Sequence, residues 1–184
     1  MRMKKTLLAL AVFTSAFTMN AMAADIEAGV VKKQIEKTTS LAMNSPDNMS
    51  DVYLNSSANI KVSAAATGIA YFEIGNIYSS NYGWEDISAS QPSSGNHGGT
   101  ALYLYIWQVG YGNVTNATMN GISMSAGLSE YRCGADLHAC TAGETATGWL
   151  YGFDFSGQQS GTFSVGSNSI ASPFGYWSDS IYIN

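Results

Sequence analysis

The sequence predicts an all-β protein with a single antiparallel β-sandwich, of the immunoglobulin-like or jelly-roll-like kind, built from about seven or eight strands. Two observations support this prediction. Charged residues make up only 11% of the 184-residue chain, which instead holds 11 Tyr, 4 Trp and 19 Gly. From residue 68 onward, apolar residues recur at every second position, and Gly, Ser and Asn cluster between the apolar stretches. We therefore assign residues 68–184 to the sandwich.

The clearest strand covers residues 101–109, where large apolar side chains alternate without interruption. One face carries Tyr103, Tyr105 and Trp107, and the other carries Leu102, Leu104 and Ile106. Because both faces are apolar, this strand is expected to be covered on both sides and to lie centrally in its sheet. Trp107 is therefore expected to be buried.

Other segments with strand-like patterns are shorter and are separated by turn residues. They cover residues 69–78, 114–119, 122–126, 146–155, 161–165 and 179–183. The dipeptide Asn120-Gly121 separates two of them and is the strongest short signal for a β-hairpin. The aromatic stripe of residues 149–155 is interpreted as core.

Residues 1–23 have the three parts of a bacterial export signal. Basic residues open the chain, an uncharged apolar stretch covers residues 6–19, and Ala21-Met22-Ala23 fits the small-residue cleavage rule. The apolar stretch is shorter than the roughly 20 residues that a membrane-spanning helix needs. The sequence therefore predicts a secreted or periplasmic protein whose mature chain contains no membrane span.

Residues 24–67 differ in composition from the rest of the mature chain. Ile26, Val30, Val31 and Ile35 recur near helical spacing, which predicts a helix over residues 25–43. A polar stretch follows, beginning with the stop signal at residues 44–47. This segment is interpreted as a helical or flexible leader, and the alternatives are a propeptide or a helix that docks on a partner.

The chain contains two cysteines, Cys133 and Cys140, with six residues between them. In an oxidising compartment they are expected to form a disulfide that stabilises the fold by about 2 kcal/mol. A metal site that adds His138 and His97 is the alternative. The cysteine spacing does not match that of structural zinc sites, so no metal is predicted.

The charge balance excludes some classes of partner. Removing residues 1–23 takes away three of the eight basic residues and none of the thirteen acidic ones, which leaves a net charge of −8. Such an acidic chain is poorly suited to nucleic acid or to anionic membranes, both of which require clustered Lys and Arg. No sequence motif indicates a cofactor, and the oligomeric state is not predicted.

Sequence motifs for catalysis are largely absent. The chain contains no nucleophile elbow, no zinc-protease motif and no phosphate-binding loop. One enzymatic alternative is a small hydrolase that uses His97 with a carboxylate such as Glu73 or Asp154. The adjacent acids Glu85 and Asp86 are interpreted as a solvated loop.

The favoured function is that of a secreted, non-enzymatic protein that binds a glycan, a cell surface or a matrix component. Aromatic residues in turn-like stretches can stack on sugar rings or contact proteins. The candidate residues are Trp84, His97, Tyr111, Tyr176 and Trp177, expected together at the loop end of the sandwich. A secreted toxin or antimicrobial that oligomerises or inserts into membranes is the second alternative, beside the His97-dependent hydrolase.

The order of motifs resembles the YolA-like group of small secreted bacterial proteins. The shared features are residues 71–74, the stretch His97-Gly98-Gly99-Thr100, residues 109–112 and the Asn120-Gly121 hairpin. The resemblance covers residues 69–184. It implies a small secreted β protein and carries over no catalytic residue, because no activity is assigned to that group. The segment between Cys133 and Cys140 is a departure from the pattern.

Overall fold

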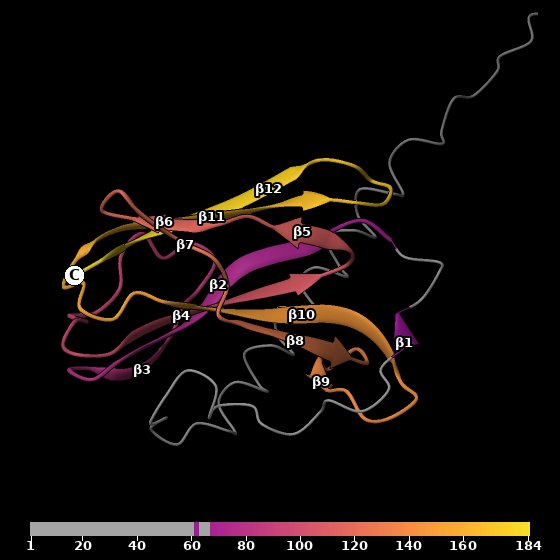
Figure 1. The fold of residues 1–184 in the computed structure, drawn as a ribbon, viewed down its shortest axis with the longest axis horizontal. Helices are drawn as coiled ribbons and strands as arrows, with labels where there is room; N and C mark the ends of the chain where they lie inside the picture. The colour runs from indigo at the N-terminus through magenta and orange to yellow at the C-terminus, as the bar shows by residue number, and fades with distance from the viewer. Residues whose placement is uncertain (1–60, 63–66) are drawn as a thin grey trace, which may run out of the picture.

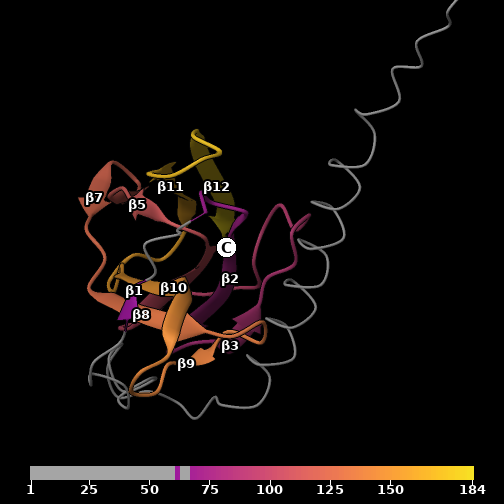
Figure 2. The same cartoon turned by 90° about the vertical axis from the view of Figure 1, so that its right-hand side faces the viewer.

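Two β-sheets lie one above the other in the computed structural model of the chain, which describes residues 61–62 and 67–184. Figures 1 and 2, drawn at right angles to each other, both show β11 and β12 on one side of the molecule and β8 and β10 on the other. The export signal of residues 1–23 and the helix expected over residues 25–43 lie outside the described residues.

The larger sheet has the strand order β3-β2-β4-β10-β8-β9, with β1 beside β10. The pairings are antiparallel except for that of β1, which runs parallel to β10. The bounds are β1 Lys61–Val62, β2 Tyr71–Ser79, β3 Gly83–Asp86, β4 Leu102–Val109, β8 Leu128–Cys133, β9 His138–Ala139 and β10 Thr145–Asp154.

The smaller sheet has the order β12-β11-β6-β7, with β5 pairing to the same side of β11 as β6. All of its pairings are antiparallel. The bounds are β5 Gly112–Val114, β6 Ala117–Met119, β7 Ile122–Met124, β11 Gly161–Ser169 and β12 Tyr176–Ile183. The described residues therefore form an all-β sandwich without helices, which confirms the predicted fold class.

Each of the strand segments expected from alternation overlaps a strand of the structure. The sequence did not predict β1, β3, β8 and β9, which are short or contain Gly, Ser and charged residues. Each of them pairs with a strand that supplies its backbone partners, since β1 and β8 pair with β10, β3 pairs with β2, and β9 pairs with β8. Their own composition would not have selected a strand.

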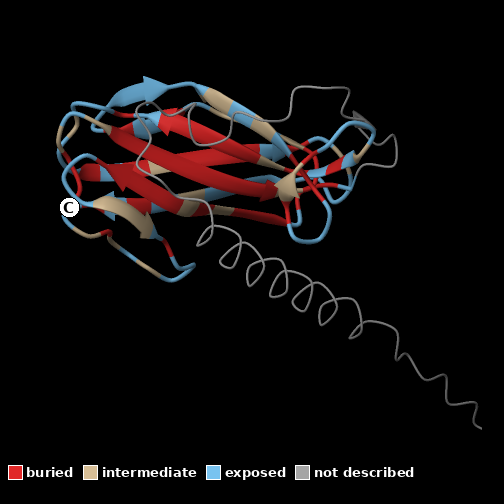
Figure 3. Cartoon of the chain, turned by 90° about the horizontal axis from the view of Figure 1, so that it is seen from below, coloured by how far each residue is buried: buried red, intermediate tan, exposed pale blue. Residues whose placement is uncertain are grey.

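The main core lies between the two sheets. From the larger sheet it receives Leu102, Leu104 and Ile106 of β4, and from the smaller sheet Phe163 of β11 and Ile181 of β12. Figure 3 shows the buried residues running along the strands. The face of β4 that carries Leu102, Leu104 and Ile106 is therefore the one covered by the smaller sheet.

The opposite face of β4 is buried in a second cluster, which we call the outer cluster. Its members are Tyr71, Tyr78, Tyr103, Tyr105, Trp107, Leu137 and Leu150. Trp107 is 1% exposed, and its indole N–H donates to the Oδ1 of Asn76 at 3.1 Å. Gly75 leaves room for the indole, because a side chain there would collide with it. Coverage of β4 on both faces is therefore confirmed.

The hairpin between β6 and β7 turns at Asn120-Gly121, as expected. Asn120 has a φ of 53° and Gly121 one of 78°. Two successive positive φ values match the twist of flanking antiparallel strands, and Asn and Gly adopt them at low cost.

Candidate functional site

Trp84 lies in strand β3, whereas the sequence placed it in a turn. Its ring centroid is 5.2 Å from that of Tyr78 and 5.4 Å from that of Tyr105, so the indole packs against the outer cluster. The half-buried ring is therefore part of the fold's packing. The expectation of an exposed loop tryptophan was wrong, because the register of β3 on β2 places Trp84 opposite Tyr78.

His97 is buried, with 2% of its surface exposed. Its Nδ1 lies 2.9 Å from the Oγ of Ser79 at the end of β2, and its Nε2 lies 2.7 Å from the Oε2 of Glu85 in β3. The imidazole thus links the glycine-rich segment before β4 to two strands of the larger sheet. The interpretation of Glu85 and Asp86 as a solvated loop is wrong, because both residues lie in β3 and the Glu85 carboxylate binds a buried side chain.

The partners of Glu85 and Ser79 define which ring nitrogen of His97 donates. The Glu85 carboxylate can only accept, and it also accepts the backbone N–H of Gly95 at 2.7 Å. In a neutral imidazole, Nε2 therefore donates to Glu85 and Nδ1 accepts the hydroxyl proton of Ser79. The Oγ of Ser79 in turn accepts the backbone N–H of Tyr82 at 3.1 Å.

Serine, histidine and glutamate in one hydrogen-bonded chain have the composition of a hydrolytic triad. Ser79 is 0% exposed, so its hydroxyl is covered by the fold. The carboxylates expected beside His97 have other partners: Glu73 accepts the hydroxyl of Tyr71, and Asp154 accepts the backbone N–H of Ser156. The pairing of His97 with Glu73 or Asp154 was therefore wrong. The burial of Ser79 and His97 favours a structural role for this network, which we call the structural clamp.

Tyr111 follows β4 at the opposite end of the sandwich and is also buried. Its hydroxyl donates to the carbonyl of Ala146 at 3.2 Å, and its ring meets Trp149 edge-on at 4.8 Å. Its backbone bridges to Gly68, just before β2 begins. Tyr111 therefore closes the end of the sandwich, and the expectation of a surface residue was wrong.

Tyr176 and Trp177 open β12 and are exposed, by 62% and 37%. The turn before β12 lies beside Gly68, because the N–H of Gly68 donates to the carbonyl of Ser172 at 2.8 Å. These two residues thus share an end with Tyr111, whereas Trp84 and His97 pack at the far end of β2. The five candidate residues do not form one surface.

Tyr176 borders a groove of about 400 Å³ on the outer face of the smaller sheet. The groove is lined by Thr115, Asn116, Thr118, Ser164, Val165, Gly166, Tyr176, Ser178, Asp179 and Ser180. The tyrosine hydroxyl lies across Gly166, whose missing side chain leaves space there. Small polar residues at alternate positions of β11 and β12 produce this face.

The acidic residue of the groove has internal partners. One carboxylate oxygen of Asp179 accepts the backbone N–H of Ile74 at 2.8 Å, and the other accepts that of Ser180 at 2.8 Å. The first bond joins β12 to β2 across one side of the sandwich. The groove therefore presents hydroxyl, amide and aromatic groups as its main chemistry.

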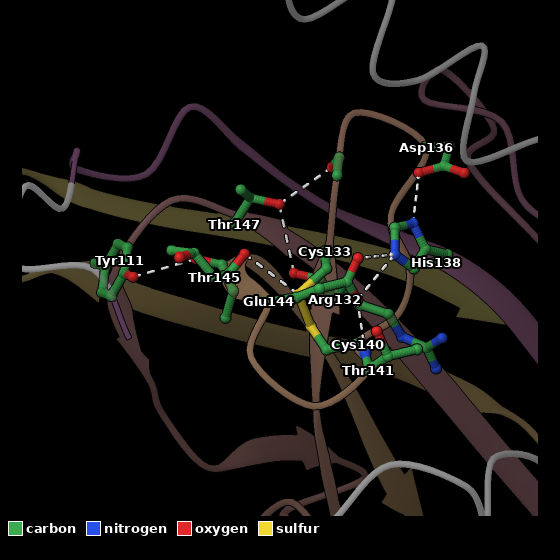
Figure 4. Close-up of a disulfide and its surroundings, with 12 residues drawn as sticks. Tyr111, Arg132, Cys133, Asp136, His138, Cys140, Thr141, Glu144, Thr145 and Thr147 are labelled. Carbon is green, nitrogen blue, oxygen red and sulfur yellow. Dashed lines mark hydrogen bonds and ion pairs between the residues drawn. A yellow bond between two sulfur atoms is a disulfide. The ribbon is translucent and has the colours of Figure 1, made fainter. Parts of the chain in front are cut away.

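Cys133 and Cys140 form a disulfide, which confirms the predicted pairing (Figure 4). The loop it closes places Leu137 in the outer cluster. Next to the disulfide, His138 contacts Asp136 at 2.7 Å and Glu144 at 3.1 Å. The hydrogen bond that the imidazole of His138 donates to the Asp136 carboxylate is the main cause that raises the pKa of His138. With the cysteine sulfurs bonded to each other, the thiolate ligands of the alternative metal site are not present.

The shifted pKa of Glu130 in β8 leads us to expect that stability depends on pH. Arg132 donates to its carboxylate at 2.8 Å, yet burial outweighs this pairing and raises the pKa of Glu130 to about 7. Because the folded-state pKa lies above the ordinary value of 4.5, stability is expected to fall as the pH rises from about 4.5 through about 7. Glu130→Gln should flatten this part of a plot of Tm against pH.

His138 contributes to the pH dependence in the same direction, because its pKa is raised in the folded protein. The stability that the protonated imidazole adds is lost as the pH rises above the ordinary pKa of histidine. His138→Gln is therefore the control that separates the two groups. The exposure of His138 and its partners makes its share small. A Glu130→Gln protein that keeps the full slope of the wild type would contradict the assignment to Glu130.

No helix within residues 61–62 and 67–184 has the length and apolar character to cross a membrane. A family model described as a domain of unknown function, DUF4879, matches residues 63–183. A comparison with curated proteins finds no match.

Proposed function

The chain belongs to the DUF4879 family, and from this premise we propose that it is a secreted, non-enzymatic protein that binds neutral glycans in the groove beside Tyr176. The observation that carries the proposal is the exposed ring of Tyr176 beside the groove, which is lined by hydroxyl and amide groups. The apolar face of a sugar ring packs on an aromatic ring, and its hydroxyls pair with polar side chains.

The charges of the domain support a neutral ligand. Residues 67–184 contain eight acidic residues and one basic residue, Arg132, which is buried. An acidic sugar would meet repulsion and would find no exposed guanidinium or ammonium group in this range. Phosphate-containing polymers are disfavoured for the same reason.

Export is part of the proposal. The pattern of residues 1–23 favours cleavage after Ala23, and a disulfide is consistent with an oxidising compartment. The resemblance to the YolA-like secreted proteins points the same way. A glycan of a cell surface or of the extracellular matrix is the partner that this location would offer.

A glycan array with neutral and acidic oligosaccharides tests the proposal. The purified mature protein should be retained by neutral members, and Tyr176→Ala should weaken retention by at least about tenfold, or about 1.4 kcal/mol. Because Tyr176 is largely exposed, Tm should stay nearly unchanged. Tyr182→Ala is the matched control, since Tyr182 is also exposed on β12 but does not line the groove.

Two further assays address the alternatives with the same protein. A hydrolase panel and a vesicle-leakage assay should both be negative. Binding to no member of the array, or equal binding by wild type and Tyr176→Ala, would overturn the proposal. Turnover or leakage would favour the hydrolase or the toxin.

A further inference from the structure

The outer cluster is buried although no strand or helix of residues 61–62 and 67–184 lies over it. The strands of these residues form two layers (Figures 1 and 2), and the smaller sheet covers the opposite face of the larger one. Yet Tyr105 and Trp107 are each 1% exposed, and Tyr103 is 7% exposed. Neighbours within one sheet shield the edges of an aromatic ring and leave its outward side open. A further segment must therefore lie over these rings.

The described turns reach only the two ends of this face. Leu137, in the turn between β8 and β9, belongs to the outer cluster and lies beside Gly148, which pairs with Val109 at the end of β4. At the other end Ala101, just before β4, packs against the cluster. Tyr105 is four residues from either end position, or about 14 Å along the strand. Its cover therefore comes from elsewhere in the chain.

β1 brings the N-terminal part of the chain to this sheet, because it pairs in parallel with the first two residues of β10. A strand of two residues forms few hydrogen bonds for the backbone entropy that it loses, so it is stable where the adjoining chain is also held. Residues 63–66 are too few to cover the face, since they link β1 to Thr67, whose carbonyl accepts the N–H of Tyr111 at the same end of the sheet. The segment that precedes β1 remains.

We propose that residues 24–60 of the same chain lie over the outer cluster and bury it. The stretch Val52-Tyr53-Leu54 gives this segment an apolar contact group, and it ends seven residues before Lys61, or about 23 Å of extended chain. The eight residues of β4 span about 27 Å. These apolar side chains can therefore reach the middle of the face while β1 stays paired. The groove beside Tyr176 lies on the other sheet, so the cover and the glycan site are independent.

The charges on this face favour the N-terminal segment over a second copy of the domain. The strand register places three carboxylates on the side of the sheet that carries the outer cluster, namely Glu73, Asp86 and Glu130. The guanidinium of Arg132 lies on the same side, over the ring of Trp107. Two copies facing each other would bring an excess of acids together. Residues 24–60 instead offer Lys32, Lys33 and Lys37 to these carboxylates.

Photo-cross-linking of the full mature chain tests the contact without disrupting it. The photoreactive residue p-benzoylphenylalanine replaces Tyr53, an aromatic residue for an aromatic one, and the cross-linked peptides are identified by mass spectrometry. Cross-links should fall on β2, β4 or β8 and not on β11 or β12. The same photoreactive residue at Tyr182, which is exposed on β12, is the matched control and should label neither β4 nor β8. In a mixture of isotope-labelled and unlabelled chains, the cross-links should stay within one chain.

Hydroxyl-radical footprinting measures the cover from the side of the sheet. In the wild type, Tyr103 and Tyr105 should be oxidised far more slowly than the exposed Tyr182. The double substitution Tyr53→Asp and Leu54→Asp should raise both rates toward that of Tyr182, because carboxylates are not buried against an apolar face without a partner.

A matched variant separates the loss of the apolar contact from the added charge. Ser56→Asp with Ser57→Asp adds the same charge to the same segment and should leave the oxidation rates of the outer cluster unchanged. Phe163 of the main core should stay protected in both double variants, which shows that the sandwich remains folded.

Each outcome supports the cover or overturns it. Cross-links between chains would assign the cover to a second copy and overturn the contact within one chain. Cross-links that miss β2, β4 and β8 also overturn it, as do wild-type rates at Tyr103 and Tyr105 that equal the rate at Tyr182. If the variant with aspartates at positions 53 and 54 also exposes Phe163, it has unfolded, and the cross-links of the photoreactive protein decide.

Discussion

Trp107→Ala is expected to lower the free energy of unfolding by about 3–5 kcal/mol, which is comparable to the whole stability of many small domains. The indole is 1% exposed in the middle of the outer cluster, so its removal leaves a cavity. The side-chain carbonyl of Asn76 would also lose its bond from the indole N–H. The guanidinium of Arg132, which lies 5.4 Å from the ring centroid, would lose its aromatic neighbour.

Urea denaturation followed by circular dichroism measures this effect. Trp107→Phe is the matched control, because it keeps much of the ring volume and loses the hydrogen bond to Asn76. It should fall between the wild type and Trp107→Ala. Tyr131→Ala removes a partly exposed ring of the same sheet and should cost far less. An unchanged midpoint for Trp107→Ala would contradict the packing described for the outer cluster.

His97→Ala is expected to destabilise the domain by about 2–4 kcal/mol. The substitution removes a buried ring and leaves the carboxylate of Glu85 and the hydroxyl of Ser79 without their bonds to it. Tyr82 would lose the surface on which it packs. Chemical denaturation measures the loss, and His138→Ala is the control, because that imidazole is partly exposed and its loss should cost less.

The same variant separates a structural His97 from a catalytic one. If His97 has a structural role, His97→Ala should lower the stability of the protein and leave any background hydrolysis unchanged. If His97→Ala instead kept the wild-type stability and abolished hydrolysis of a substrate such as p-nitrophenyl acetate, the clamp would be wrong. The triad of Ser79, His97 and Glu85 would then become the leading interpretation.

Among the features predicted from the sequence, those that agree with the structure are local in origin. Alternation over residues 101–109 identified a central strand with Trp107 buried, because a strand's side-chain period is independent of its partners. Asn120-Gly121 identified a hairpin, since the turn needs positive φ at both positions. Two cysteines in a chain that the sequence predicts to be exported identified the disulfide.

The positions of the candidate site residues depend on pairing between distant segments, which the sequence pattern did not predict. Trp84 became half-buried only because β3 pairs with β2 in a register that places it opposite Tyr78. Glu85 and His97 meet through the fold of the segment between β3 and β4, and no spacing rule connects them. Tyr176 is the one candidate whose largely exposed ring also borders a groove.

The sequence by itself determined the all-β class, the two-sided central strand, the hairpin and the disulfide, because each depends on backbone geometry or chemistry within a short stretch. Only the tertiary structure decided which aromatic rings are buried by packing and which are exposed to solvent. Exposure is a property of what lies over a side chain, and for Trp84, His97 and Tyr111 that cover comes in part from other strands and turns. The groove likewise exists only where segments distant in sequence come together.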